Sequence, residues 1–313
     1  MQKITEENYY QDITHISASM IKKYKFCPEL FNATYISKEF VKHEKEEKAL
    51  IIGSAVDVLL TEPENWDKHF VVPSLQITEV VNKKTGEIKK KKGARKANED
   101  GLFIDEKGRH QLTDEDYKMM LACEKEVRRQ PLFKEYCQNA ETQVIIQTEF
   151  DGIKVKGKLD FLNWEKKAII DLKTCKSVNE LEYKSEYKKG SIKEFSYDFQ
   201  GSWYERLAFA KHNIPEEEQK EWKFYLACVD KKKFCNRFIM LEIPKETLDI
   251  AYEEMLGING DNQKITLLEK MQAGIETGIF SCNNKERKIS CFNCEHYRNC
   301  QYSLQRKPEL IKQ

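Results

Sequence analysis

A run of alternating side chains near the middle of the chain predicts a β-hairpin and constrains the fold around it. Residues 153–161 switch between an apolar and a polar set, the pattern of a strand with one buried face. A turn near Glu165 and Lys166 would return the chain through residues 168–173 as the second strand. The apolar set is Ile153, Val155, Gly157, Leu159 and Phe161, and the polar set is Lys154, Lys156, Lys158 and Asp160.

The same hairpin is expected to bring two carboxylates and one ammonium group into a small volume. A symmetric two-residue turn sets Asp160 opposite Asp171, with their Cβ atoms roughly 5 Å apart. Lys173 shares a strand face with Asp171 because side chains alternate. Adjacent carboxylates repel unless a proton or cation lies between them, and Mg²⁺ favours oxygen ligands. The pattern predicts a metal site where Lys173 could orient or help deprotonate a water molecule, although an ordinary hairpin with solvated charges is the alternative.

Length, charge and apolar content exclude several classes of protein. With 313 residues the chain could form one large α/β domain or two smaller ones, and we favour a single domain with appendages. Its 53 basic and 52 acidic residues give no overall indication of a nucleic-acid partner. No run of about 18 apolar residues occurs and the start is polar, so neither a membrane span nor a secretion signal is predicted. We therefore expect a cytoplasmic protein whose ten cysteines are reduced thiols or metal ligands.

Hydrophobic periodicity predicts further helices and strands around the hairpin. A helix over residues 15–35 is expected to be capped by Ser17 or Ser19 and broken at Cys27 and Pro28. Residues 49–60 are apolar nearly all round and should form a buried helix. The lysine-rich stretch 82–100 should be a mobile loop or a ragged hairpin. Other helices are expected at 114–129, 197–211 and 246–255, and other strands at 143–150, 223–228 and 234–243.

Cysteines near the end of the chain form a second constellation. Cys291, Cys294 and Cys300 have C-x2-C-x5-C spacing and could surround one metal centre whose fourth ligand comes from elsewhere. Cys27 is the natural candidate, and a [4Fe–4S] cluster would then tie the two chain ends together. Zinc also suits four thiolates, although C-x5-C is a less common zinc spacing, and Cys282 could replace Cys27 in a local zinc site. Buried reduced thiols are the remaining alternative.

The hairpin motif resembles the PD-(D/E)xK nuclease superfamily, especially its RecB-like and RecE-like phage and prophage exonucleases, over most of the chain. The resemblance implies an α/β fold with a restriction-endonuclease-like core, in which helices flank a mixed central β-sheet. By this resemblance Asp160 and Asp171 are the acidic metal ligands, Lys173 is the catalytic lysine, and the main-chain carbonyl of Leu172 faces the metal.

Four further residues are carried over by the same resemblance. Gln200 and Tyr204 match a Q-x3-Y element that follows the core, and their i, i+4 spacing puts them on one helix face. They could meet DNA or the catalytic lysine there, although Q-x3-Y also occurs by chance in many helices. Asp57 stands where the family ordinarily has a metal-binding histidine, and a carboxylate in so apolar a helix is costly to bury without a partner, unless it lies on an exposed edge. Glu141 resembles an acidic residue that precedes the first core strand.

The cysteine pattern resembles the iron–sulfur clasp of the bacterial AddB helicase–nuclease subunit and of the CRISPR-adaptation nucleases. It implies a [4Fe–4S] cluster on Cys27, Cys291, Cys294 and Cys300, with zinc as the second choice. The expected organisation is one nuclease domain over residues 1–313. Residues 1–45 form a helical part that contributes Cys27, residues 46–245 form the core, and residues 246–313 form a C-terminal helical segment with a cysteine-rich clasp.

The expected function is metal-dependent hydrolysis of DNA by an exonuclease that uses Mg²⁺ or Mn²⁺. The RecE-like resemblance implies resection of linear double-stranded ends for recombination, beside a single-strand annealing protein, in a bacterial or phage-infected cell. A CRISPR-adaptation-type nuclease that trims short DNA, and a non-enzymatic DNA-binding protein with a structural zinc site, are the alternatives. Cleavage polarity and oligomeric state are left open. Basic side chains that could grip phosphates, or simply be solvated, are Lys89, Lys90, Lys91, Lys92, Arg95 and Lys96.

Overall fold

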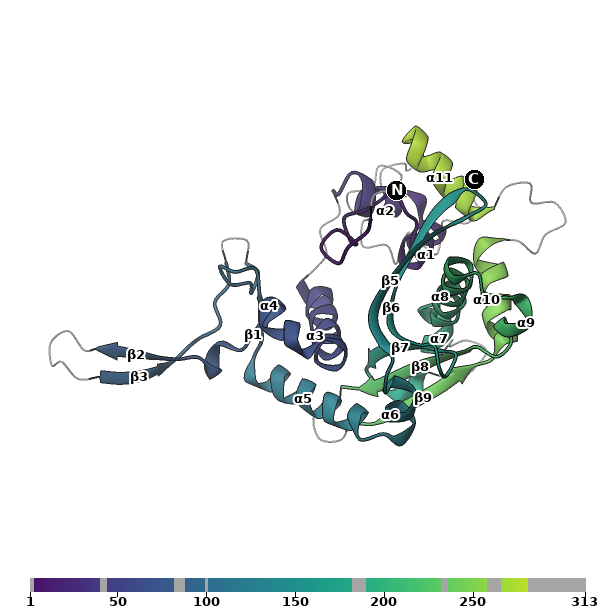
Figure 1. The fold of residues 1–313 in the computed structure, drawn as a ribbon. Helices are drawn as coiled ribbons and strands as arrows, with labels where there is room; N and C mark the ends of the chain where they lie inside the picture. The colour runs from purple at the N-terminus through teal and green to yellow at the C-terminus, as the bar shows by residue number, and fades with distance from the viewer. Residues whose placement is uncertain are drawn as a thin grey trace, which may run out of the picture.

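A five-stranded mixed sheet forms the centre of the computed structural model, which describes residues 3–39, 44–81, 88–98, 101–181, 190–231, 236–257 and 266–280 (Figure 1). Its strand order is β5-β6-β7-β8-β9. The β7–β8 pair is parallel and the other pairs are antiparallel, which confirms the expected mixed sheet. The strands are β5 (Glu141–Phe150), β6 (Ile153–Asn163), β7 (Ala168–Cys175), β8 (Lys223–Asp230) and β9 (Phe238–Ile243).

Helices cover both faces of this sheet, as the predicted α/β fold requires (Figure 1). One face packs against α8 (Tyr197–His212) and α10 (Lys245–Leu256), and the other against α3 (Glu44–Thr61), α5 (Asp114–Arg128) and α6 (Pro131–Cys137). At one end lie α1 (Ala18–Phe26), α2 (Pro28–Phe31) and α11 (Leu267–Thr277). The short helices are α4 (Trp66–His69), α7 (Ser191–Glu194) and α9 (Glu216–Gln219).

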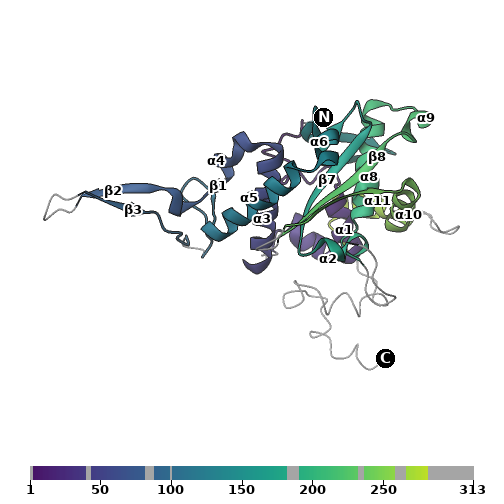
Figure 2. The ribbon, with the colours of Figure 1, turned by 90° about the horizontal axis from the view of Figure 1, so that it is seen from below.

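A separate hairpin of β2 (Ile77–Val81) and β3 (Ile88–Lys92) projects away from this body in both views (Figures 1 and 2). Its second strand, β3, lies within the lysine-rich region 82–100 for which a loop or ragged hairpin was predicted, and its first strand precedes that region. The short strands β1 (Phe70–Val71) and β4 (His110–Gln111) pair in parallel at its base. None of the helices in the described part of the chain is both long and apolar enough to cross a membrane.

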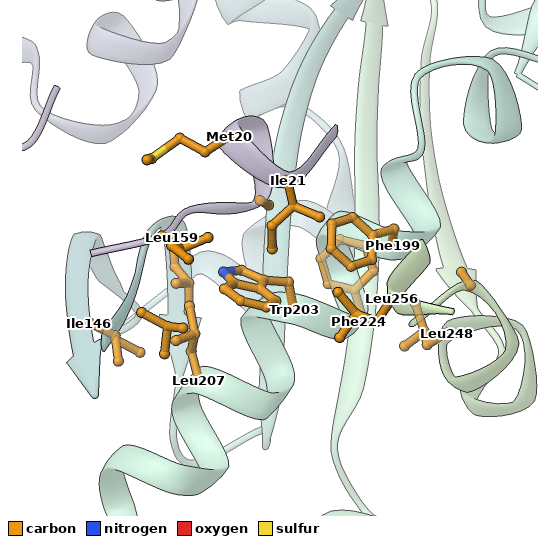
Figure 3. Packing of buried hydrophobic residues seen from close by; sticks show 14 of the residues in the cluster. Met20, Ile21, Ile146, Leu159, Phe199, Trp203, Leu207, Phe224, Leu248 and Leu256 are labelled. Atoms are coloured by element: carbon orange, nitrogen blue, oxygen red, sulfur yellow. The ribbon is translucent and has the colours of Figure 1, made fainter. Parts of the chain in front are cut away.

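Two apolar cores, one on each face, hold the helices to the sheet. On the α8 side Trp203 is fully buried against residues of α1, β6 and β8, among them Ile21, Leu159 and Phe224 (Figure 3). On the α3 side Val56 and Met120 pack with Ile170. Apolar cores cover both faces of β7 and β8. The sequences of these two strands are almost continuously apolar for this reason.

Local signals set most element ends close to their expected positions. The first helix begins at Ala18 because the Ser17 side chain accepts a hydrogen bond from Met20 N, and it ends before Cys27 and Pro28 as predicted. Its continuation is shorter than expected, since α2 passes into a π-helical turn over Asn32–Ile36. Strand β9 starts at Phe238, four residues later than the predicted strand.

Candidate active site

The hairpin of β6 and β7 opens into a fork at the two predicted carboxylates. The strands pair at Phe161–Ile170, Leu162–Ile169 and Asn163–Ala168, and the next position of this register would join Asp160 to Asp171. The turn spans residues 164–167 rather than the expected 165–166. Both turns are centred on the same point, so the register is the predicted one. Beyond the fork β7 no longer pairs with β6 but stays paired with β8. The edge of β6 that β7 leaves is partly covered by Ile16, which forms a bridge with Val155.

Asp160 stands at the mouth of the fork and is held by the neighbouring strand. The main-chain N–H of Leu172 donates to its Oδ2 at 2.7 Å. On the other side, β5 pairs at Thr142–Phe161 and at Val144–Leu159, so Gln143 is opposite Asp160 but outside the ladder. The φ of Gln143 is 51°, a left-handed value that costs free energy for a side chain other than glycine. This distortion interrupts β5 beside the candidate site.

Gln143 links β5 to Asp57 of helix α3. Its Nε2 donates to Asp57 Oδ2 at 2.9 Å and lies 3.0 Å from Thr61 Oγ1. The other carboxylate oxygen, Asp57 Oδ1, is buried with no hydrogen-bond partner in the described structure. Burial raises the pKa of Asp57 to about 6, against partial compensation by the hydrogen bond from Gln143. Asp57 is therefore a partly buried carboxylate bonded to Gln143 rather than a residue on an exposed helix edge.

Asp171 is the most deeply buried of the three aspartates, at 1% exposure; its Oδ1 accepts a hydrogen bond, and its Oδ2 lies in an ion pair but has no hydrogen-bond partner in the described structure. Lys173 Nζ lies 2.6 Å from its Oδ2, and Gln200 Nε2 donates to its Oδ1 at 3.0 Å. Gln200 Nε2 also lies 2.9 Å from Tyr204 OH. Burial by itself lowers the pKa of Lys173, but the charges of Asp171 and Asp160 outweigh it and raise the pKa overall. The fork thus gathers Asp171, Lys173, Gln200 and Tyr204 through direct contacts.

Lys22 of helix α1 belongs to the same cluster, although no sequence motif pointed to it. Its Nζ donates to Gln200 Oε1 at 3.1 Å and to the main-chain oxygen of Phe195 at 3.2 Å. Burial and the nearby charge of Lys173 lower its pKa to about 8. Lys22 lies in the nine-residue helix α1 and is 178 residues from Gln200 in sequence, so no local pattern marks this contact.

The three aspartates Asp57, Asp160 and Asp171 form what we call the carboxylate cluster. Burial raises the pKa of Asp160 well above its ordinary value, and the charges of Asp57 and Asp171 raise it further. Each carboxylate has its own donors, and within the described residues no three His, Cys, Asp or Glu side chains already surround a metal-sized space. The cluster nevertheless suits a hard divalent cation, because it offers repelling carboxylates and the unpartnered oxygen Asp57 Oδ1.

Of the other predicted site residues, Leu172 lies beside this cluster, and the rest lie apart from it or outside the described part. Glu141 is exposed and accepts a hydrogen bond from Trp164 Nε1 at 2.9 Å. Leu172 O lies 3.4 Å from Lys173 Nζ. Cys27 is partly buried at the end of α1. Cys282, Cys291, Cys294 and Cys300 lie outside the described residues, so the cysteine clasp stays a prediction.

Most of the predicted phosphate-binding residues lie on the projecting hairpin or just beyond it. Lys90, Lys91 and Lys92 are exposed on β3, whereas the side chain of Lys89 is outside the described part. The Arg95 guanidinium stacks 3.5 Å from the centre of the Phe103 ring, and its Nε donates to Gln111 O at 2.8 Å. The main-chain N–H of Lys96 donates to the Gln111 side chain. Arg95 therefore has a structural role at the base of the hairpin.

Comparisons with known proteins agree with this architecture. A family model described as a PDDEXK-like domain of unknown function (DUF3799) matches residues 17–274. The crystal structure of a candidate exonuclease from Eubacterium rectale superposes with a TM-score of 0.58 at 16% identity, covering 92% of this chain and 98% of that one. The crystal structure of a phage-related exonuclease from Haemophilus somnus matches 54% of this chain and 76% of its own at 11% identity, with a TM-score of only 0.31. No curated protein matches the chain.

Proposed function

This chain belongs to the PDDEXK-like family DUF3799, and on that premise we propose that it is a metal-dependent nuclease that hydrolyses phosphodiester bonds of DNA. The observation that carries the proposal is the fork between β6 and β7. There Asp160, Asp171 and Lys173 meet in the predicted register, and Lys173 Nζ lies 2.6 Å from Asp171 Oδ2. Membership of the family and the fold of the candidate exonuclease support it.

The carboxylate cluster and the carbonyl of Leu172 are the groups that would hold one or two Mg²⁺ or Mn²⁺ ions. A bound divalent cation supplies Lewis-acid stabilisation of the charge that develops on the phosphate. Asp57, with its unpartnered Oδ1, would take the place of the family's histidine. An oxygen ligand in this position suits Mg²⁺ and Mn²⁺ at least as well as a ring nitrogen does.

The protein's own side chains would orient the reacting groups. Lys173 is placed to donate a hydrogen bond to an attacking water or to a phosphate oxygen while it holds Asp171. Gln200 fixes the other oxygen of Asp171, and Tyr204 OH lies beside the same amide. The nucleophile and the phosphate would therefore meet groups whose positions are set by three elements, β6, β7 and α8.

We further propose that the enzyme acts on double-stranded ends as an exonuclease for recombination, beside a single-strand annealing protein. End-labelled linear, nicked and circular DNA should be incubated with Mg²⁺, with Mn²⁺ and with a chelator. Loss of linear DNA alone, and only with metal, supports the exonuclease. Short-fragment trimming without processive digestion would favour a CRISPR-adaptation-type enzyme. Binding without any hydrolysis under all three conditions would contradict a nuclease function.

We also propose that Cys27 joins Cys291, Cys294 and Cys300 in a [4Fe–4S] clasp. Support comes from the chain before these cysteines, because the Phe280 ring packs 5.7 Å from the Phe31 ring. Phe31 N donates to Cys27 O, one helical turn earlier. Iron and zinc contents and the visible spectrum of anaerobically purified wild type and Cys27→Ser test the clasp. Iron in wild type that is lost in Cys27→Ser supports the clasp. Zinc in both proteins would indicate a zinc site instead, and absence of metal from both would mean that the cysteines are reduced thiols.

A further inference from the structure

The N-terminal segment of residues 3–16 runs along the edge of β6 that β7 leaves at the fork. Ile16 pairs with Val155 of β6 in an isolated parallel bridge: Ile16 N donates to Lys154 O and Lys156 N donates to Ile16 O, both at 2.9 Å. The Lys156 side chain is only 3% exposed, and its Nζ donates to the main-chain oxygens of Tyr9 and Asp12 at 2.6 and 2.5 Å. This buried ammonium fixes the path of the segment beside the strand that carries Asp160.

A second set of contacts holds the segment on the other side of Tyr9. Lys158, two residues before Asp160, forms an ion pair with Glu6. Ile4 N donates to the side chain of Gln147 on β5 at 2.8 Å. The backbone of residues 9 and 10 is therefore held between two anchors beside the strand that carries Asp160.

Tyr10 presents an exposed aromatic ring at this point. Its side chain is 79% exposed, while the ring of the partly buried Tyr9 meets it edge to face at 5.2 Å. Lys156 Nζ lies 4.7 Å from the Tyr9 ring and fixes that ring in turn. Desolvation raises the pKa of Tyr10; the positive charge of Lys158 acts in the opposite direction, and the negative charges of Asp57 and Asp160 raise the pKa further. The ring is thus within electrostatic reach of two members of the carboxylate cluster.

We propose that Tyr10 is a stacking platform for an unpaired nucleobase that flanks the phosphate bound at the carboxylate cluster. This inference rests on the proposed nuclease function and adds a specificity element to it. Every nucleobase has an aromatic face, so stacking on tyrosine binds DNA with little sequence preference. A base on Tyr10 has to leave its neighbour in the duplex, which is easiest at an open end. The platform would therefore favour frayed or single-stranded termini over continuous duplex.

The test measures stacking in a chain that cannot cleave, Lys173→Ala, with Ca²⁺ present. The probe is a duplex with a short single-stranded end that carries 2-aminopurine, whose fluorescence falls when it stacks on an aromatic ring. Tyr10→Ala should abolish the quenching on binding and weaken affinity about tenfold, the size of one base–aromatic stack. Tyr10→Phe should keep both. Phe26→Ala is the matched control, because Phe26 is also an exposed ring, at 42%, but lies at the C-terminal end of α1.

The outcomes separate this inference from the proposed function. The parent protein is the Lys173→Ala chain. If adding Tyr10→Ala to it changed neither the quenching nor the affinity, at an unchanged melting temperature, the platform would be overturned even if the wild-type enzyme digests DNA. Quenching that depends on Tyr10, in a protein whose Lys173-containing form cleaves nothing, would support the platform and contradict the nuclease. Failure of the parent to bind the probe at all would overturn the platform.

Discussion

Lys22 Nζ donates to Gln200 Oε1 at 3.1 Å and thereby sets the orientation of the Gln200 amide. An ammonium group can only donate, so it selects the carbonyl oxygen of the amide. The amide nitrogen then faces the opposite way and donates to Asp171 Oδ1 at 3.0 Å. Helix α1 is in this way connected to the buried carboxylate at the fork.

The first prediction is that Lys22 acts through Gln200. Lys22→Met should lower kcat about tenfold, because the amide is free to rotate away from Asp171. Residues in one hydrogen-bond network have non-additive effects, so Lys22→Met/Gln200→Ala should be no slower than Gln200→Ala alone. Lys22→Arg should retain most activity, since it also donates. Steady-state kinetics on linear DNA measures kcat for wild type, the two single variants and the double variant. If the double variant lost kcat by the product of the two single losses, Lys22 would act independently of Gln200.

The second prediction concerns Lys173. Lys173→Ala should reduce hydrolysis by about 10²-fold or more, because a cationic donor beside the reacting phosphate is removed. DNA affinity should change far less, since backbone binding is spread over many contacts. Gel-based cleavage and anisotropy measure the two effects. Lys154→Ala, an exposed lysine of β6, is the control and should cleave like wild type. Full activity of Lys173→Ala would remove the proposed mechanism.

The third prediction is a pH-dependent cost of ionising Asp57. Burial raises its pKa from 3.8 to about 6 in the folded chain. Such a group contributes stability that is fully present below about 3.8 and is lost as the pH rises to about 6. Asp57→Asn remains neutral throughout. It should therefore gain about 1–3 kcal/mol in unfolding free energy relative to wild type between about pH 4 and pH 7.

Urea denaturation in chelator-containing buffer measures this difference. Asp67→Asn is the control, because Asp67 is an exposed carboxylate and its replacement makes the same change in net charge. Its stability relative to wild type should stay nearly constant over the same range. A difference for Asp57→Asn that does not depend on pH would mean that Asp57 is not buried as a charge in solution. Added Mn²⁺ should stabilise wild type more than Asp57→Asn if the cluster binds the ion.

A fourth prediction follows from the close approach of α8 to the sheet. A Cβ at Gly201 would lie 2.5 Å from Cδ1 of the fully buried Phe224 ring. Gly201→Ala should therefore cost about 1–3 kcal/mol of stability through overpacking and should shift Gln200, its neighbour, away from Asp171. Thermal melts and cleavage assays measure both effects. The helical glycine Gly53 has Thr174 Oγ1 as its nearest neighbour at 3.3 Å, so Gly53→Ala should melt near wild type.

Sequence patterns predicted the parts of the site that short-range geometry controls. Alternation over residues 153–161 and the position of the turn were enough for the Asp160–Asp171 register, because side-chain direction has a period of two along a strand. Helix spacing likewise placed Gln200 and Tyr204 on one face. In both cases the partners are close in sequence or lie within one element.

The contacts that sequence reasoning missed join distant segments. Gln143 has a left-handed backbone that glutamine does not favour intrinsically, and it reaches Asp57, 86 residues away. Lys22 and the N-terminal segment reach the fork through tertiary packing of α1 and through Lys156. Polar residues in amphipathic helices and strands are ordinarily solvated, so no periodicity marks the few that turn inward. Glu141 illustrates the opposite case, a motif-like acid that contacts Trp164 instead.

The last prediction concerns the projecting hairpin as a DNA grip. Strand β3 projects away from the body of the molecule, and its exposed lysines can neutralise DNA phosphates at a distance from the candidate active site (Figure 2). Replacing Lys90, Lys91 and Lys92 by Gln should weaken binding equally for unrelated sequences and reduce the slope of log affinity against log salt by about 2–3. A matched triple change of exposed lysines on α5 and α6, at Lys118, Lys125 and Lys134, should leave the slope near wild type. Equal slopes for all three proteins would show that DNA does not touch the hairpin, because counterion release counts only the phosphates that a protein neutralises.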